Sequence, residues 1–197
     1  RRTTGMEDRL AALVERLPDG LADLPAMSLV GPPMLALFKA EGVAVVNRRG
    51  VHTYGCAPSE SEISQIDRWL LAQPGDQVYA TDRLGAESGL TVDPARAAGL
   101  LMAPAHAIGN GVPRARFYWF RPEQPRTVHW AGDPLKPLGP NTDTGALSPR
   151  RSFELWVDTT CGCSEPWDEL DMMGARMLRI VLLRGDAGRV ERAPVAQ

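Results

Sequence analysis

The chain has 197 residues, with 22 Lys and Arg against 24 Asp and Glu, which gives a net charge of −2 at pH 7. This length is typical of one domain with extensions, and 44% hydrophobic against 23% charged residues excludes a wholly disordered chain. The balanced charge offers no attraction for a polyanion, so we expect no nucleic-acid partner. No apolar run reaches about 18 residues and no signal peptide is recognisable, so we expect no membrane span.

The N-terminal part of the chain predicts helix, strands and helix in that order. Apolar side chains recur on one face of residues 6–17, as in an amphipathic helix. Ser59 and Glu62 have the spacing of a capping box, which predicts a helix over 60–72. Between these helices, short apolar runs separated by glycine turns predict a meander of three strands, at 34–38, 43–47 and 51–54.

The middle of the chain adds strands and one helical turn. Residues 77–81 read as a short strand, and 94–98 as a helical turn that begins at a proline. Residues 99–105 and 116–121 are apolar at nearly every position, the pattern of strands that are buried on both faces. Together these elements predict an α+β domain, in which helices pack to one side of an antiparallel sheet.

A long irregular segment follows the last of these strands. Residues 126–132 begin as a strand, but 133–149 contain four prolines and no regular pattern. Compact domains rarely contain such a long connection unless it is functional or disordered. Beyond it, 152–157 fit either helix or strand, 166–183 predict a final helix, and 185–197 read as a polar tail.

The cysteines do not point to a metal or catalytic site. The chain has three cysteines, and this odd number does not form a disulfide framework, which favours a reducing cytoplasm. Only one residue separates Cys161 from Cys163, which is a poor spacing for zinc ligands. No second cysteine pair or histidine cluster completes four ligands. We therefore expect two incidental thiols and no metal; a redox or hydrolytic role for either thiol is an open alternative.

Two motifs flank the proline-rich segment. One is Pro149-Arg150-Arg151-Ser152-Phe153, and the other is Trp130-Ala131-Gly132, with Phe120-Arg121-Pro122-Glu123 upstream. Their order and spacing closely resemble the PHY domain, the phytochrome-specific domain, as found in bacterial phytochromes. The resemblance follows the element order over about 25–183 and is specific over about 117–157.

The resemblance implies a GAF-like fold, with a central antiparallel sheet flanked by helices and a long excursion called the tongue. In that family the tongue seals the pocket of a linear tetrapyrrole, biliverdin in bacterial members, which the neighbouring GAF domain binds. The tongue stabilises the far-red-absorbing state and refolds between hairpin and helix to relay light signals. The chain alone would then bind no cofactor and would not be an enzyme.

The resemblance also assigns roles to tongue residues. Arg150 would pair with an aspartate of the GAF domain in the red-absorbing state, and Ser152 would replace it in the far-red-absorbing state. A guanidinium suits the first role because it can bind a carboxylate through two charge-assisted hydrogen bonds. Trp130 and Trp156 would exchange packing positions. The other packing positions of the motif are Gly132, Pro149 and Phe153.

The implied domain organisation has four parts. Residues 1–24 would be a connecting helix cut from the GAF–PHY linker, and 25–165 the PHY domain, with its tongue at about 117–157. Residues 166–184 would be a helix toward an output module, and 185–197 a flexible tail. The expected partners are the PAS-GAF chromophore module of the same polypeptide, the output module, for example a histidine kinase in two-component signalling, and a second copy of the parent as a homodimer.

The alternative from another class is a GAF-like domain that binds a small ligand of its own, such as a cyclic nucleotide. Its mark would be an internal pocket with convergent polar groups.

Overall fold

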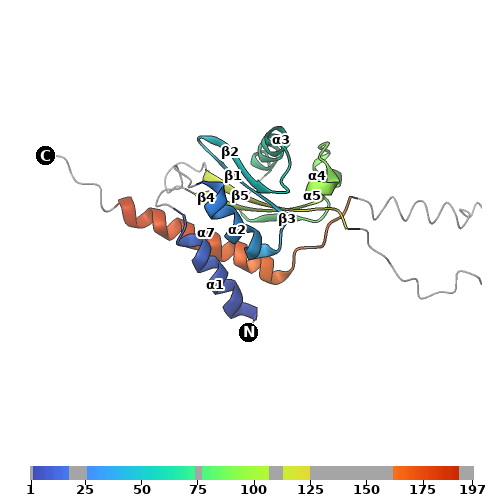
Figure 1. Cartoon of the computed structure of the whole chain (residues 1–197). Coiled ribbons are helices and arrows are strands. Elements are labelled where there is room, and N and C mark those ends of the chain that lie inside the picture. Colours follow the sequence, from blue (N-terminus) through green and yellow to red (C-terminus); the bar gives the residue numbers. More distant parts are fainter. Residues whose placement is uncertain (1, 18–25, 74–76, 107–112, 125–161, 191–197) are drawn as a thin grey trace, which may run out of the picture.

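The computed structural model describes residues 2–17, 26–73, 77–106, 113–124 and 162–190. Within these residues, five antiparallel strands form one sheet in the order β2-β1-β5-β4-β3 (Figure 1). The strands are β1 (Gly42–Asn47), β2 (Gly50–Gly55), β3 (Tyr79–Thr81), β4 (Gly99–His106) and β5 (Pro113–Arg121). Since β5 is the central strand, the segment that follows it starts from the middle of the sheet.

Helices cover both faces of this sheet (Figure 1). One face carries α1 (Arg2–Val14), α2 (Met27–Phe38) and α7 (Glu169–Val190). The other carries α3 (Glu60–Leu71), α4 (Leu84–Ser88) and α5 (Pro94–Ala97). The α+β class with a central antiparallel sheet flanked by helices is thus confirmed. The expectation that helices pack to one side only is wrong, because strands that are apolar on both faces need cover on both.

Strand β5 shows why two cores form. Its side chains alternate between the faces, so Phe117 and Trp119 join the core under α1, α2 and α7, while Tyr118 and Phe120 join the core under α3. All four are fully buried. The indole Nε1 of Trp119 donates a hydrogen bond to the Met34 carbonyl at 2.9 Å, which ties the sheet to α2. The expected burial of this strand on both faces is confirmed.

The strand expected at 34–38 is wrong, because these residues form the end of α2. Their apolar pattern continues upstream at helical spacing, and the buried side chains are Val30, Met34, Leu37 and Phe38. Pro32 and Pro33 lie inside the helix, where proline removes backbone donors, so local propensity pointed away from a helix. Burial of the apolar side chains of α2 in the core outweighs this unfavourable local propensity. A Cβ on Gly31 would lie 2.6 Å from Tyr54 Cβ, so glycine lets α2 approach β2.

Most other expected elements are present. The capping box is confirmed: Glu62 N donates to Ser59 Oγ at 3.3 Å, and Ser59 N donates to Glu62 Oε2 at 2.9 Å. The helix expected at 6–17 corresponds to α1, the meander strands at 43–47 and 51–54 to β1 and β2, and the turn at 94–98 to α5. The short helix α4 had no clear signal in the sequence.

The last helix begins and ends later than expected. It starts at Glu169 instead of 166 and continues to Val190, through residues 185–190 that we expected to belong to the polar tail. An isolated glycine in a helix costs only about 1 kcal/mol, which a longer helix tolerates. Gly174 has a packing reason, since a Cβ there would lie 2.8 Å from the Phe38 ring and 2.9 Å from Met6 Sδ. No helix in the described part combines the length and the apolar character that crossing a membrane requires.

Candidate functional site at the base of the excursion

The motif residues singled out in the sequence lie outside the described residues. They are Trp130, Gly132, Pro149, Arg150, Ser152, Phe153 and Trp156. The strand expected at 126–132 and the ambiguous segment 152–157 lie there as well. The structure does describe the two segments from which the excursion starts and to which it returns. We call them the exit segment, 121–124, and the return segment, 162–168.

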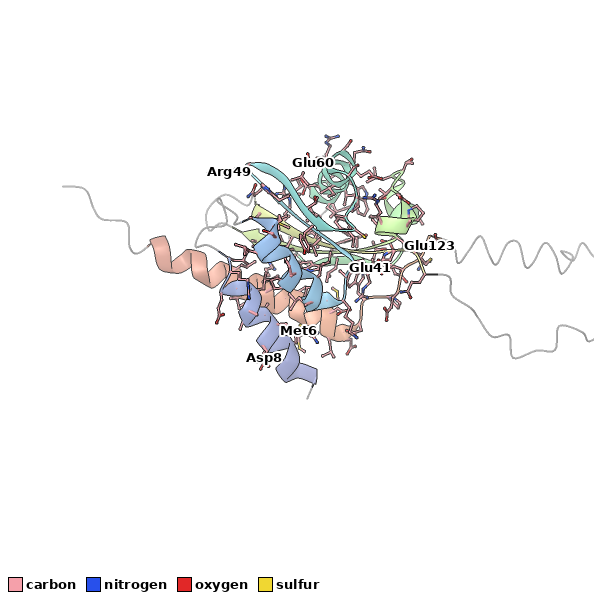
Figure 2. The ribbon with its side chains drawn as sticks, in the orientation of Figure 1. Met6, Asp8, Glu41, Arg49, Glu60 and Glu123 are labelled. Carbon is pink, nitrogen blue, oxygen red and sulfur yellow. The ribbon has the colours of Figure 1, made fainter. Side chains whose placement is uncertain are left out.

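The exit and return segments are hydrogen-bonded to each other. Gln124 N donates to the Cys163 carbonyl at 2.9 Å, and Gly162 N donates to Glu123 Oε1. Glu123 is labelled in Figure 2, at one end of the folded part. Gly162 has φ +79, the left-handed backbone region in which glycine is unstrained. The excursion therefore begins and ends at a closed, paired base.

This base is seated on the sheet. Glu123 N donates to the Pro94 carbonyl at 2.8 Å, and Ser164 N donates to the Asp82 carbonyl at 2.9 Å. Ser164 is fully buried against the first residue of β4, Gly99. A Cβ on Gly99 would lie 2.8 Å from Ser164 Cβ and closer still to its hydroxyl. The return segment can take this position only because residue 99 has no side chain.

Arg121 sits at the centre of the base and is only 6% exposed. Its Nη2 donates to the Phe38 carbonyl at 2.8 Å and to Asp171 Oδ2 at 3.0 Å, and its Nη1 donates to the Pro166 carbonyl at 2.9 Å. The guanidinium carbon lies 3.8 Å from the centroid of the Trp167 ring, a cation–π contact. One side chain thus joins the exit segment to α2, the return segment and α7.

The start of α7 is capped by two aspartates. Asp171 N donates to Asp168 Oδ1 at 2.8 Å, and Asp168 N donates to Asp171 Oδ2 at 3.2 Å, a reciprocal arrangement like a capping box. Trp167 Nε1 donates to the Thr81 carbonyl at 3.0 Å and fixes the residue before the cap. Burial raises the pKa of Asp171, while the Asp168 backbone N–H and the charge of Arg121 oppose this rise.

A second buried ion pair lies on the other face of β5. Arg116 Nη2 donates to Asp67 Oδ2 at 2.8 Å, and both Arg116 Nε and the Tyr118 hydroxyl donate to Asp67 Oδ1. Burial raises the pKa of Tyr118 well above its ordinary value, and the neighbouring Asp67 carboxylate adds to the rise. This pair fixes α3 to the sheet. Breaking such a pair by removing one partner typically costs about 3–5 kcal/mol.

Sequence reasoning missed both ion pairs. The available signal was a charged residue at each end of an otherwise apolar strand, Arg116 and Arg121, but nothing local identifies their partners. Asp67 and Asp171 are 49 and 50 residues away from them in the chain.

The thiols take no part in a described cluster. Cys163 is buried, Cys56 is exposed, and Cys161 lies outside the described residues. Across 2–17, 26–73, 77–106, 113–124 and 162–190, no three His, Cys, Asp or Glu side chains group as metal ligands. The chemistry of the described base is that of ion pairs and backbone hydrogen bonds, which hold segments together.

Comparison with known proteins gives a consistent match. Residues 6–187 match the family model described as the phytochrome region, PHY. Cyanobacterial phytochrome B of Nostoc sp. is 33% identical over 156 residues, which are 77% of this chain and 20% of that protein. A bacteriophytochrome of Pseudomonas aeruginosa is 28% identical over 177 residues, covering 89% of this chain and 24% of that protein. The chain thus spans about a fifth to a quarter of the length of these relatives.

A solved structure has the same fold. The crystal structure of the bacteriophytochrome RpBphP3 from the photosynthetic bacterium R. palustris is similar with a TM-score of 0.63 and 27% identity. The similarity covers 95% of this chain and 38% of that one.

Proposed function

The chain belongs to the phytochrome-region (PHY) family, and we propose that it is the non-catalytic regulatory domain of a red/far-red photoreceptor of the bacteriophytochrome kind. The observation that carries this proposal is the closed base of the excursion. Gln124 N donates to the Cys163 carbonyl at 2.9 Å and joins the two ends of the excursion, while Glu123 N donates to the Pro94 carbonyl of α5 at 2.8 Å and fixes the exit segment on the folded part. A segment that contacts a neighbouring domain needs such a firm attachment, because otherwise a change in its contacts would not be transmitted to the rest of the domain.

The excursion is the tongue in this proposal. It seals the bilin pocket of an adjacent GAF domain, stabilises the far-red-absorbing state and refolds between hairpin and helix on illumination. Arg150 pairs with an aspartate of that domain in the red-absorbing state and Ser152 takes its place in the other. Trp130 and Trp156 exchange packing positions, and Gly132, Pro149 and Phe153 shape the arms. An Arg–carboxylate pair that is sealed from water contributes more than the roughly 0–1 kcal/mol of an exposed one.

The bilin, biliverdin in this proposal, belongs to the neighbouring domain. In the described part, both faces of the sheet are packed with apolar side chains of the chain's own helices, so the two cores are filled by protein. When bound in the neighbouring domain, the bilin supplies light absorption and isomerisation. This chain excludes water from the bilin pocket and transmits the conformational change. No observation among the described residues favours a ligand of the domain's own.

The proposed context is a cytoplasmic photoreceptor. Its partners are the PAS-GAF module of the same polypeptide and an output module, as in two-component signalling, with a second copy in a homodimer. Residues 1–24 and 166–184 are the proposed connecting helices, and α1 and α7 pack together in the same core.

The test is photochemistry of the intact photoreceptor with biliverdin. Arg150→Ala should shift the light-minus-dark spectrum or change the rate of thermal reversion, because the red-absorbing state loses its Arg–carboxylate pair while the far-red-absorbing state does not. Arg151→Ala is the matched control, since it removes the same side chain from the neighbouring position, to which the resemblance assigns no role. Unchanged light-minus-dark spectra and reversion in Arg150→Ala would count against the proposal, as would equal effects of both substitutions.

A further inference from the structure

Arg121 lies where the excursion leaves the sheet and where the last helix begins. It is the last residue of β5, and its guanidinium is buried. Its partners come from three separate segments: the end of α2, the return segment and the first turn of α7. A guanidinium has five N–H donors in one rigid plane and can bind partners in several fixed directions at once; the lysine ammonium has three rotatable donors and no planar fork.

The return segment leaves α7 little freedom to move alone. It is held by Ser164 N on the Asp82 carbonyl at 2.9 Å and by Trp167 Nε1 on the Thr81 carbonyl at 3.0 Å. We call the contacts of the Arg121 guanidinium with Asp171 and the neighbouring carbonyls the clamp. Asp171 accepts from both Asp168 N and Arg121, so the cap of α7 and the clamp share one carboxylate. A displacement of the return segment must therefore change either the cap of α7 or the Arg121 contacts.

The contact at Phe38 extends this connection to the helix packing. Arg121 Nη2 binds the Phe38 carbonyl at 2.8 Å, and the ring of Phe38 lies where a Cβ on Gly174 of α7 would be 2.8 Å away. Met6 of α1 meets the same position at 2.9 Å. The residue that Arg121 holds is thus the one on which α7 crosses α2, with α1 beside it.

We infer that Arg121 is a positioning residue that couples the base of the excursion to helix α7, so that a rearrangement of the excursion changes the first turn of α7 and its packing. This inference rests on the proposed function. It places Arg121 in the transmission of the signal and outside the sealing of the bilin pocket, which separates its role from that of the tongue motif.

The experiment measures hydrogen exchange of α7 amides in the intact photoreceptor, in the dark and under red light, together with absorption spectra. In Arg121→Lys, photoconversion should persist, while the factor by which red light changes the α7 exchange rates should shrink by about 2- to 30-fold, the range for single coupling positions. Asp171→Ala, which removes the other end of the clamp, should do the same. It serves as the second variant if Arg121→Lys does not fold.

Arg116→Lys is the matched control. It weakens a buried bidentate pair on the same strand, but that pair joins α3 on the opposite face. It should leave the light response of α7 as in the unmodified protein. An equal loss of response in Arg116→Lys would overturn the inference, because any damage to β5 would then suffice.

Two further outcomes would overturn the inference. If both clamp variants keep the full α7 response, Arg121 is structural only. If they lose photoconversion together with the α7 response, Arg121 acts on the pocket and not on transmission. Failure of the proposed function would give a different result: deleting residues 125–161 from the photoreceptor, with Arg121 and Asp171 unchanged, would leave photoconversion as it was.

Discussion

Replacing Gly99 with alanine should destabilise the domain by pushing the return segment off the sheet. The new Cβ would lie 2.8 Å from Ser164 Cβ, closer to its hydroxyl, and 3.4 Å from Arg121 Cβ. Ser164 is fully buried and its backbone is hydrogen-bonded to Asp82, so it cannot simply rotate away.

The expected loss can be added up from the contacts. Overpacking of a buried site costs about 1–3 kcal/mol. Lengthening the Ser164–Asp82 hydrogen bond adds about 1 kcal/mol. Against this, alanine restricts the unfolded chain and returns about 0.4–1 kcal/mol. The net free energy of unfolding should therefore fall by about 1–3.5 kcal/mol, or about 2–14 °C in Tm for a chain of this size.

Urea unfolding of the chain measures this loss, with Gly85→Ala as the control. Gly85 lies in α4, and a Cβ there meets only the Leu90 carbonyl, at 4.0 Å, so alanine should be neutral or stabilising. The double variant Gly99→Ala with Ser164→Gly removes the clash, so in the Ser164→Gly background Gly99→Ala should cost little. A Gly99→Ala variant within about 0.5 kcal/mol of the unmodified chain would refute the reasoning, since surface changes alone have that size.

Two other expectations concern α3. Asp67→Ala should lower the free energy of unfolding by about 3–5 kcal/mol, because Arg116 would stay buried without its carboxylate; Arg116→Met with Asp67→Leu should recover most of this loss, and no recovery in urea unfolding would contradict the argument. The hydrogen bonds with Ser59 lower the pKa of Glu62, so the ionised carboxylate contributes stability above the unfolded pKa of about 4.5, which is lost as pH falls through the folded pKa. Ser59→Ala should therefore cost about 1 kcal/mol at pH 7 and less at pH 3; a cost that does not shrink at low pH would show that the carboxylate has no part in the cap.

The sequence predicted well where the determining interaction is local. The capping box of α3 joins residues that are three positions apart in the chain. The continuous apolar runs of β4 and β5 predict the burial of these strands. The family was also evident from short motifs, because the Pro149–Phe153 and Trp130–Gly132 patterns are specific and lie in fixed order. The roles of the residues within those motifs remain predictions.

Prediction failed where packing decides between equal local choices. The apolar run 34–38 suits a strand or a helix, and its upstream prolines argued against the helix that the core of the sheet stabilises. The polar residues from 185 onward suggested that the last helix ends at 183, but α7 continues to Val190. Propensity is a weak prior in such segments, since burial of one face outweighs it.

The sequence by itself determined the class of fold, the two-sided burial of its central strands and the family. Only the tertiary structure decided that helices cover both faces, and that Arg116 and Arg121 on opposite sides of β5 pair with Asp67 and Asp171. The physical reason is chain distance. Periodicity and capping act over a few residues, whereas a buried ion pair joins whichever charges the folded sheet brings together, and no local pattern records that choice.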